Sequence, residues 1–130
     1  MGPAAKQGDK VIGVDTHIVM IPSPGGPVPT PMPMPFNGTL SGKLCSKVLI
    51  ENKPAATKDS TADNLPPHVP AGGPFQKSPS NKATVKKGSG KVLFDNKEAA
   101  RLGDPADTCN DPTDLPNGTV IGTGTVFIGG

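Results

Sequence analysis

The sequence predicts a small, mostly β protein in which three pseudo-symmetric β-hairpin repeats are joined by long irregular loops, with almost no helix. Two observations support this class. One phrase of the sequence recurs three times, and the 130 residues include 17 glycines and 17 prolines. With 33% hydrophobic residues and neither Trp nor Tyr, composition alone would favour a disordered chain. The recurrence argues for order instead, because internal self-similarity indicates stacked or symmetric copies of one supersecondary unit.

The recurring phrase joins an apolar segment to a polar turn and then to an Ala-Ala pair. It reads VLIENKPAA at 48–56 and VLFDNKEAA at 92–100, and its first half returns as TVFIGG at 125–130. The N-terminal GPAAKQGD supplies the missing second half, so that Met1 and Gly2 complete the turn that Gly130 leaves open. We therefore expect a closed pseudo-threefold object formed by one domain over 1–130. Its repeat units span approximately 3–50, 54–94 and 98–128.

Within each unit, the apolar runs are expected to be strands and the polar triplets to be turns. Glu-Asn-Lys at 51–53 and Asp-Asn-Lys at 95–97 each separate two runs of β-forming residues, as hairpin turns do. The stretch NKEAARLGD resembles a helix, but its equivalent in the preceding unit carries Pro54, so we expect no helix there. Segments 21–36 and 64–80 are rich in proline and are expected to be irregular. The first is interpreted as a rigid surface loop, with a polyproline II ligand as the alternative.

The two histidines and one of the two cysteines occupy related places in the three units. His17 and His68 follow Pro3 and Pro54 at the same spacing, and Cys109 lies in the corresponding region of the third unit. Imidazole and thiolate are the ligands of tetrahedral zinc sites. Because a threefold arrangement would bring them together on its axis, we expect one structural zinc ion per chain. The alternative is two histidines in surface loops and an unrelated buried thiol.

The fourth ligand of such a site is left open by the sequence. Cys45 aligns with Ser89 and Thr123, so the repeat does not place it beside the other three ligands. We interpret Cys45 as a small core-facing residue, with metal ligation as the alternative. Asp15, Asp107, Asp111 or a water could complete the coordination. A bound water would leave an open site, as in a zinc-dependent hydrolase, but no set of catalytic side chains is visible and we expect no enzyme.

Charge and hydropathy exclude several other classes of function. The net charge is +2, and the lysines are spread along the chain without interleaved aromatic residues, so we expect no nucleic-acid partner. No apolar run is long enough to cross a bilayer, and the N-terminus lacks a charged segment followed by an apolar one. We therefore expect a protein made in the cytoplasm without a signal peptide.

The motifs PAAKQGD, NKPAATKD and NKEAARLGDPADTC resemble the PAAR-repeat family, named for its Pro-Ala-Ala-Arg motif, and the resemblance covers essentially the whole chain. It implies a small β-rich cone that caps the trimeric spike of a type VI secretion system or a related contractile injection system. It also implies a zinc ion near the point of the cone, with the ligand roles falling on His17, His68 and Cys109. The chain departs from the motif at Lys6, Thr57 and Glu98, and its second copy has no glycine before Asp59.

The same resemblance implies a mechanical function. The cap would sharpen the spike for membrane puncture and carry effector cargo, and no fused effector domain is expected in 1–130. The machine would deliver it to the outside or into a target cell. Its blunt end would bind a homotrimeric β-helical spike, one cap per trimer, through turns that are equivalent in the three repeats. The residues expected at this base are Asn52, Lys53, Asn96, Lys97 and Gly129.

Overall fold

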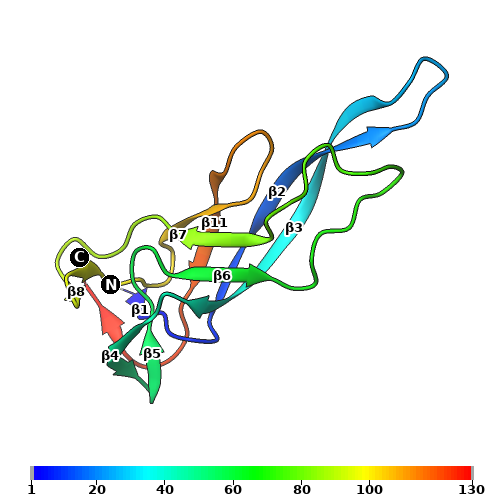
Figure 1. The fold of residues 1–130 in the computed structure, drawn as a ribbon. Coiled ribbons are helices and arrows are strands. Elements are labelled where there is room, and N and C mark those ends of the chain that lie inside the picture. The colour runs from blue at the N-terminus through cyan, green and yellow to red at the C-terminus, as the bar shows by residue number, and fades with distance from the viewer. Residues whose placement is uncertain (1, 130) are drawn as a thin grey trace.

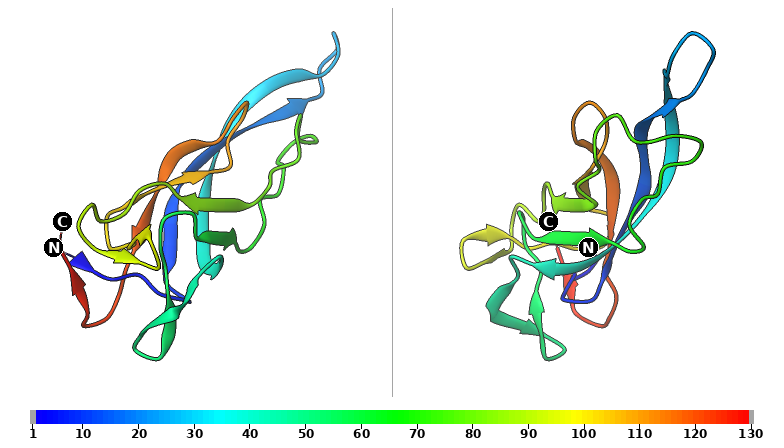
Figure 2. Two further views of the ribbon diagram at one scale, coloured as in Figure 1. Left: turned by 60° about the vertical axis from the view of Figure 1, so that its left-hand side comes forward. Right: turned by 45° about the vertical axis from the view of Figure 1, so that its right-hand side comes forward.

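The computed structural model describes residues 2–129 and contains no helix in that range, so none that could cross a membrane. The molecule is elongated, broad at the end that holds both termini and narrow where the β2–β3 hairpin projects (Figure 1; Figure 2). All named elements are strands, which confirms the predicted mostly β class. The strands are β1 (Gly2–Pro3), β2 (Lys10–Ile21), β3 (Val28–Gly42), β4 (Cys45–Ile50), β5 (Lys53–Ala55), β6 (Thr61–Asn64), β7 (Lys82–Val85), β8 (Leu93–Phe94), β9 (Lys97–Glu98), β10 (Pro105–Thr108), β11 (Leu115–Ile121) and β12 (Phe127–Ile128).

The strand pairing repeats three times, with four strands in each unit. The middle strands of the units form the hairpins β2–β3, β6–β7 and β10–β11, which close together into one antiparallel barrel. The outer strands pair between units, β4 with β5, β8 with β9 and β12 with β1. The β12–β1 pair closes the ring at the chain ends. The predicted contribution of Met1 and Gly130 to this junction lies outside the described residues.

The Ala-Ala pairs of the repeat lie where the three units meet. The N–H of Ala5 donates to the carbonyl of Ala100 at 2.9 Å, that of Ala100 to Ala56 at 3.0 Å, and that of Ala56 to Ala5 at 3.0 Å. These bonds form a closed triangle of fully buried residues. Because three backbones converge there, a side chain larger than a methyl group would overpack the centre. The recurring alanines therefore mark the pseudo-threefold axis.

Each Ala-Ala pair is followed by a tight turn that a side chain closes. Asp9 and Asp104 each accept a backbone N–H three residues earlier, at 3.1 and 2.9 Å, and Ser60 does the same in the second unit at 2.9 Å. The residue before each acceptor has a positive φ, which is 89° at Gly8 and 77° at Asp59. Asp59 therefore takes the place of the glycine and Ser60 the place of the aspartate. This corrects the alignment that equated Asp59 with the motif's aspartate.

The predicted hairpin turns are present. Glu51 and Asn52, like Asp95 and Asn96, have positive φ values between 53° and 68°, the conformation of a type I′ turn, which favours Asn. They connect β4 to β5 and β8 to β9 in the same register, with Ile50 opposite the first residue of β5 and Phe94 opposite that of β9.

The expectation of an irregular loop over 21–36 is wrong for 28–36 and right only for the turn at 22–27. Residues from Val28 onward form β3, which pairs continuously with β2 from Ile21↔Val28 to Lys10↔Thr39. The strand accommodates the prolines of this segment because they occupy only every second position of β3. By contrast, 65–81 forms no named strand apart from one bridge of Phe75 to Val19, in agreement with the irregular segment predicted there.

Candidate metal centre

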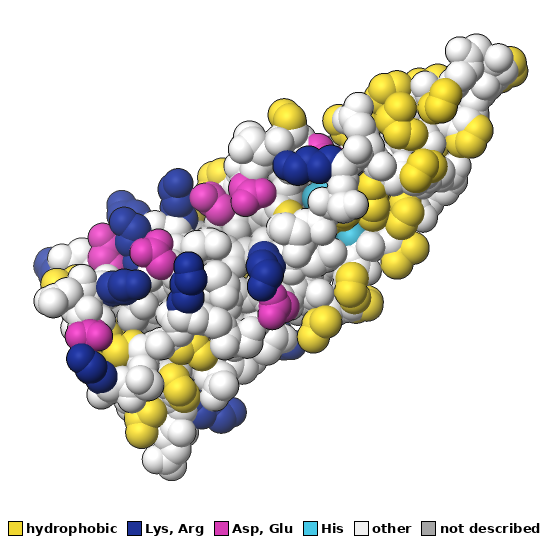
Figure 3. Space-filling model, viewed as in Figure 1, with side chains coloured by type: hydrophobic (Ala, Val, Ile, Leu, Met, Phe, Trp, Pro, Cys, Tyr) yellow, Lys and Arg dark blue, Asp and Glu magenta, His cyan; other side chains and the backbone are white. Residues whose placement is uncertain are grey.

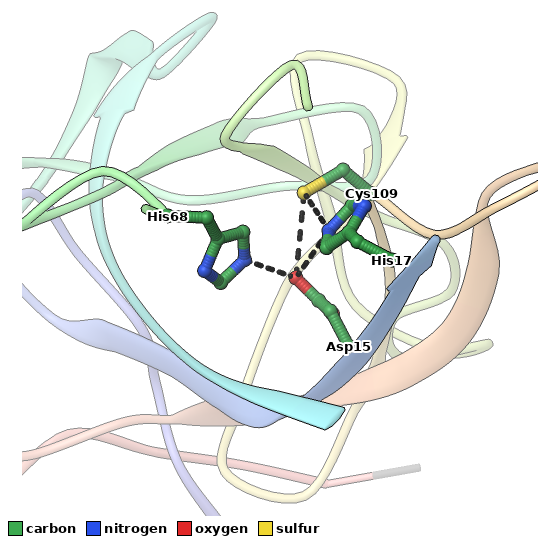
Figure 4. A group of neighbouring side chains, drawn as sticks. All are labelled: Asp15, His17, His68 and Cys109. Carbon is green, nitrogen blue, oxygen red and sulfur yellow. Dashed lines mark hydrogen bonds and ion pairs between the residues drawn. The ribbon is translucent and has the colours of Figure 1, made fainter. Parts of the chain in front are cut away.

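Four side chains from all three units converge beside the barrel (Figure 4). Asp15 and His17 lie on β2 and point to the same face because strand residues two apart share a side of the sheet. His68 belongs to the irregular segment after β6, and Cys109 directly follows β10. One donor atom from each residue lies within 4.8 Å of the others. The alternative to a metal site put both histidines in surface loops, and the place of His17 in a strand contradicts it for that residue.

The separations between these atoms are close to those of a tetrahedral site, and two of the four short ones fall within its range. Zinc at about 2.0–2.3 Å from its donors would hold neighbouring donors about 3.3–3.8 Å apart. Asp15 Oδ2 lies 2.9 Å from His68 Nε2, 3.3 Å from Cys109 Sγ and 4.0 Å from His17 Nε2. Cys109 Sγ lies 3.6 Å from His17 Nε2. Small side-chain movements would equalise these distances around one ion.

The burial of the cluster calls for a cation. Asp15 and His17 are 0% and 1% exposed, and among the described residues only histidines lie within ion-pair distance of the Asp15 carboxylate. Asp15 Oδ1 and His17 Nδ1 have no hydrogen-bond partner within residues 2–129. Burying a carboxylate without a compensating charge is costly, and buried polar atoms are normally satisfied. A bound metal ion would compensate the carboxylate.

The electrostatics of the cluster favour a neutral histidine and, without metal, a neutral thiol. Burial, followed by the proximity of His68, lowers the pKa of His17, which leaves its imidazole free to act as a ligand. Burial, followed by the charge of Asp15, raises the pKa of Cys109 to about 11. A bound divalent cation would lower the pKa of Cys109 instead, because it stabilises the thiolate and displaces the thiol proton.

Two polar side chains support the histidines from outside the cluster. Asp111 Oδ2 lies 3.7 Å from His17 Nδ1, on the side of the ring away from the cluster, and accepts the N–H of Ile18 at 2.9 Å. A carboxylate behind the imidazole is the usual outer partner of a metal-binding histidine. Asn64 stands behind His68, with its amide nitrogen 3.3 Å from His68 Nδ1.

The orientation of Asn64 defines the tautomer of His68 in the metal-free protein. The N–H of Asn37 donates to Asn64 Oδ1 at 2.9 Å, so the NH₂ group of Asn64 faces both Asn81 Oδ1 and His68 Nδ1. Nδ1 must then accept, and the ring proton resides on Nε2, where it is donated to Asp15 Oδ2. Metal binding through Nε2 would require this proton to move to Nδ1.

The structure brings three of the four candidate ligands named from sequence together and leaves Cys45 out. Cys45 is half-buried on β4 and lines a separate cavity of ≈ 90 Å³ with Phe94 and Lys97. Of the carboxylates considered, Asp107 pairs with Lys86 at 3.4 Å, whereas Asp15 joins the cluster. The sequence signal for Asp15 as a ligand is its spacing of two residues from His17, which in a strand places both side chains on one face. The signal was not recognised because the segment after His17 was interpreted as a loop.

Two hollows border the cluster. A cavity of ≈ 120 Å³ is lined by His17, Cys109 and Asp111, and a groove of ≈ 420 Å³ runs past His68 between Met34 and Val69. They provide a route for a small ion to the buried donors.

The residues predicted at the base lie at the opposite, broad end, on the β4–β5 and β8–β9 ribbons and beside β12 (Figure 1). Asn52, Lys53, Asn96 and Lys97 are exposed. Gly129 is half-buried, and its carbonyl accepts hydrogen bonds from Ser89 Oγ at 2.6 Å and Arg101 Nη1 at 2.9 Å.

Sequence reasoning missed three apolar side chains on the same ribbons. Leu49, Leu93 and Phe127 are 59%, 55% and 57% exposed and occupy the same register, opposite Pro54, Glu98 and Pro3. Their neighbours Ile50 and Ile128 point inward and are buried. The period-two alternation of these short strands was the available signal.

Comparison with protein-family models and with curated proteins finds no match to this chain.

Proposed function

We propose that this protein is a zinc-stabilised tip that caps a homotrimeric β-helical spike of a contractile injection or type VI secretion system. The observation that carries the proposal is the broad end of the molecule, where one chain presents three equivalent β-ribbons around a pseudo-threefold axis. The PAAR-like motifs point to the same function, since the alanines that they share form the hydrogen-bonded triangle on that axis.

The exposed residues Leu49, Leu93 and Phe127 are the contacts that such a partner would bury. An apolar side chain repeated once per unit matches a partner that offers the same pocket three times, as a homotrimer does on its axis. Strand ends at the ribbons add main-chain hydrogen bonds that tolerate sequence differences between the units. One chain per trimer is the expected stoichiometry.

The metal that the cluster would hold is zinc, through Asp15, His17, His68 and Cys109. Two imidazoles, one thiolate and one carboxylate form a tetrahedral donor set. Zinc bound there would add folding free energy to a core that is rich in alanine and therefore buries little apolar surface. The alternative, a hydrolase with an open zinc site, has less support because a fourth protein donor takes the position that a reactive water needs. Bound effector cargo and contact with a target membrane belong to the same proposal.

The stoichiometry of the complex is the decisive test. The protein is mixed with a homotrimeric β-helical spike protein of a contractile injection system from the same genome, and the complex is weighed by native mass spectrometry. We expect one chain per trimer. The triple variant Leu49→Asp, Leu93→Asp and Phe127→Asp should lose binding while keeping its thermal unfolding midpoint within a few degrees, because the three side chains are exposed.

A control variant places two aspartates elsewhere on the molecule. Val14→Asp and Val28→Asp change residues that are 56% and 48% exposed on the β2–β3 hairpin, far from the base. This variant should bind as the parent does. Three chains per trimer, or unchanged binding by the triple base variant, would refute the proposed geometry.

A further inference from the structure

The segment that carries His68 is the longest connection between two named strands, running over 65–81 from β6 to β7. Figure 3 shows histidine side chains at the surface between the charged broad end of the molecule and its apolar narrow end. Residues 64–76 contain no Lys, Arg, Asp or Glu. Because ordering so long a segment costs conformational entropy, the position of His68 depends on the hydrogen bonds that hold the segment.

Asn81 holds this segment from its far end, directly before β7. Its side-chain oxygen Oδ1 accepts the backbone N–H of His68 at 2.8 Å and the amide nitrogen of Asn64 at 3.2 Å. Its backbone carbonyl accepts the N–H of Asn64 at 2.8 Å. One residue therefore joins the two ends of the segment and fixes the backbone of His68 between them.

The backbone of Asn81 lies beside another donor of the cluster, Cys109. Thr108 pairs with Ala83 between β10 and β7, so the residues just before Ala83 lie next to the residue that follows β10. Burial raises the pKa of the Cys109 thiol, whereas hydrogen bonds from the backbone N–H groups of Asn81 and Lys82 lower it. Such donors stabilise the thiolate, which is the form of cysteine that binds a metal.

The backbone conformation at this position explains why the residue is asparagine. Asn81 has a φ of 57°, in the left-handed region that glycine and asparagine adopt most readily. Of these two, only asparagine also offers a side-chain oxygen to the N–H of His68.

From these observations we propose that Asn81 is a positioning residue that holds His68 and Cys109 in place together, so that donors from two repeat units are ready for one metal ion. Asn81 is not itself among the four clustered donors, and it therefore acts through its neighbours. The inference rests on the metal centre of the proposed function and adds a residue on which that centre depends.

Asn81→Gly tests the side chain alone, because glycine keeps the left-handed backbone and its N–H. In a chelator competition we expect this variant to bind zinc at least about tenfold more weakly than the parent. Asn81→Asp keeps an oxygen for the N–H of His68 and should lose no more than about threefold. The matched control is Asn96→Gly, since Asn96 has a φ of 67° and is exposed in the β8–β9 turn, away from the cluster. It should change the affinity by less than about twofold.

Two further measurements separate positioning from a general effect on the fold. In the metal-free protein, the backbone N–H of His68 should exchange with solvent at least about tenfold faster in Asn81→Gly than in the parent. In a His68→Ala background, Asn81→Gly should cost less than about threefold in zinc affinity, because the imidazole that it positions is gone. Cobalt(II) reports the donors directly. Its visible absorption in Asn81→Gly should weaken as in His68→Ala, while the sulfur-to-cobalt charge-transfer band remains, because Cys109 keeps its backbone donors.

The outcomes distinguish this inference from the metal centre on which it rests. Equal zinc affinity in Asn81→Gly and the parent, unchanged exchange at His68, or a tenfold loss that persists in the His68→Ala background would overturn the role of Asn81 and leave the metal centre standing. A folded parent that binds neither zinc nor cobalt would overturn both.

Discussion

His68 Nε2 lies 2.9 Å from Asp15 Oδ2, and this contact joins the second repeat unit to the first in the interior of the cluster. In the metal-free protein it is a hydrogen bond, whose proton the orientation of Asn64 holds on Nε2. The same two atoms are the ones that a zinc ion would separate and bind. The contact therefore has two states, and several predictions depend on which of them is occupied.

The first prediction concerns the metal itself. Protein purified without added metal should contain about one zinc per chain by elemental analysis. Cys109→Ser should lower zinc content and reduce the free energy of unfolding by several kcal/mol, because it removes a ligand from a structural site. Cys45→Ser serves as the matched control and should cost about 1 kcal/mol or less, since Cys45 lies outside the cluster. Zinc content well below one in a folded parent would contradict the structural-metal proposal.

A second prediction follows from the proton on His68. Zinc bound at Nε2 requires a proton on Nδ1, and that proton would face the NH₂ group of Asn64. Asn64→Asp replaces this donor by an acceptor, so we expect zinc to bind about tenfold more tightly or better in a chelator competition. Nitrogen-15 spectra of the histidines should show the proton on Nε2 without metal and on Nδ1 with zinc.

The control for this prediction is Asn37→Asp, which adds the same charge at an exposed neighbouring residue. It should change the affinity by less than twofold. An equal gain in both variants would mean that net charge, and not the tautomer of His68, sets the affinity.

A third prediction uses the raised pKa of Cys109. An ordinary thiol has a pKa of 9.0, and burial holds that of Cys109 at about 11 in the fold. Above pH 9 the unfolded chain loses this proton while the folded chain retains it, so the stability of the metal-free protein falls as the pH rises from 9 to 11. The loss should reach about 2–3 kcal/mol. Denaturant unfolding of metal-free parent and Cys109→Ser at each pH isolates the effect, because only the parent carries this thiol. Parallel profiles would contradict the prediction.

Zinc affinity should rise with pH, whereas the stability of the metal-free protein falls with pH. Binding displaces the Cys109 proton, so the affinity should rise about tenfold per pH unit in the range where one proton is released. Chelator competitions at pH 6, 7 and 8 measure the slope. An affinity independent of pH would mean that the thiolate is not a ligand.

The sequence was sufficient for the β class, for the hairpin turns and for three of the four clustered donors, because each has a local signature. The polar triplets at 51–53 and 95–97 mark the turns, and the histidines repeat with the units. Asp15 was one of several open alternatives, since assigning it required knowing that β2 continues through His17. Leu49, Leu93 and Phe127 were missed because strands as short as β8 (Leu93–Phe94) and β12 (Phe127–Ile128) show the period-two alternation only over two residues, which makes it a weak signal.

The prediction for the proline-rich segment 21–36 was wrong for a different reason. Proline normally argues against a strand because it removes a ladder hydrogen bond. In β3 the prolines occur only at alternate positions, whose nitrogens face the free edge, so the ladder to β2 remains intact. The alternation in VPTPMPMP was visible in the sequence, but its meaning depends on which edge of the strand is open.

The last prediction tests this role of the prolines. Pro31→Thr with Pro33→Thr would restore two N–H donors to the open edge of β3 and add residues that favour strands. An edge with paired donors and acceptors invites another strand, so we expect the variant to associate with itself at concentrations where the parent does not. Light scattering after size-exclusion chromatography measures the mass of each over a dilution series. Pro24→Thr with Pro27→Thr, which changes the exposed turn beyond the paired residues, controls for the loss of two prolines and should keep the parent's mass. If the Pro31 and Pro33 variant also kept the parent's mass at every concentration, the open edge would be protected by something other than its missing donors.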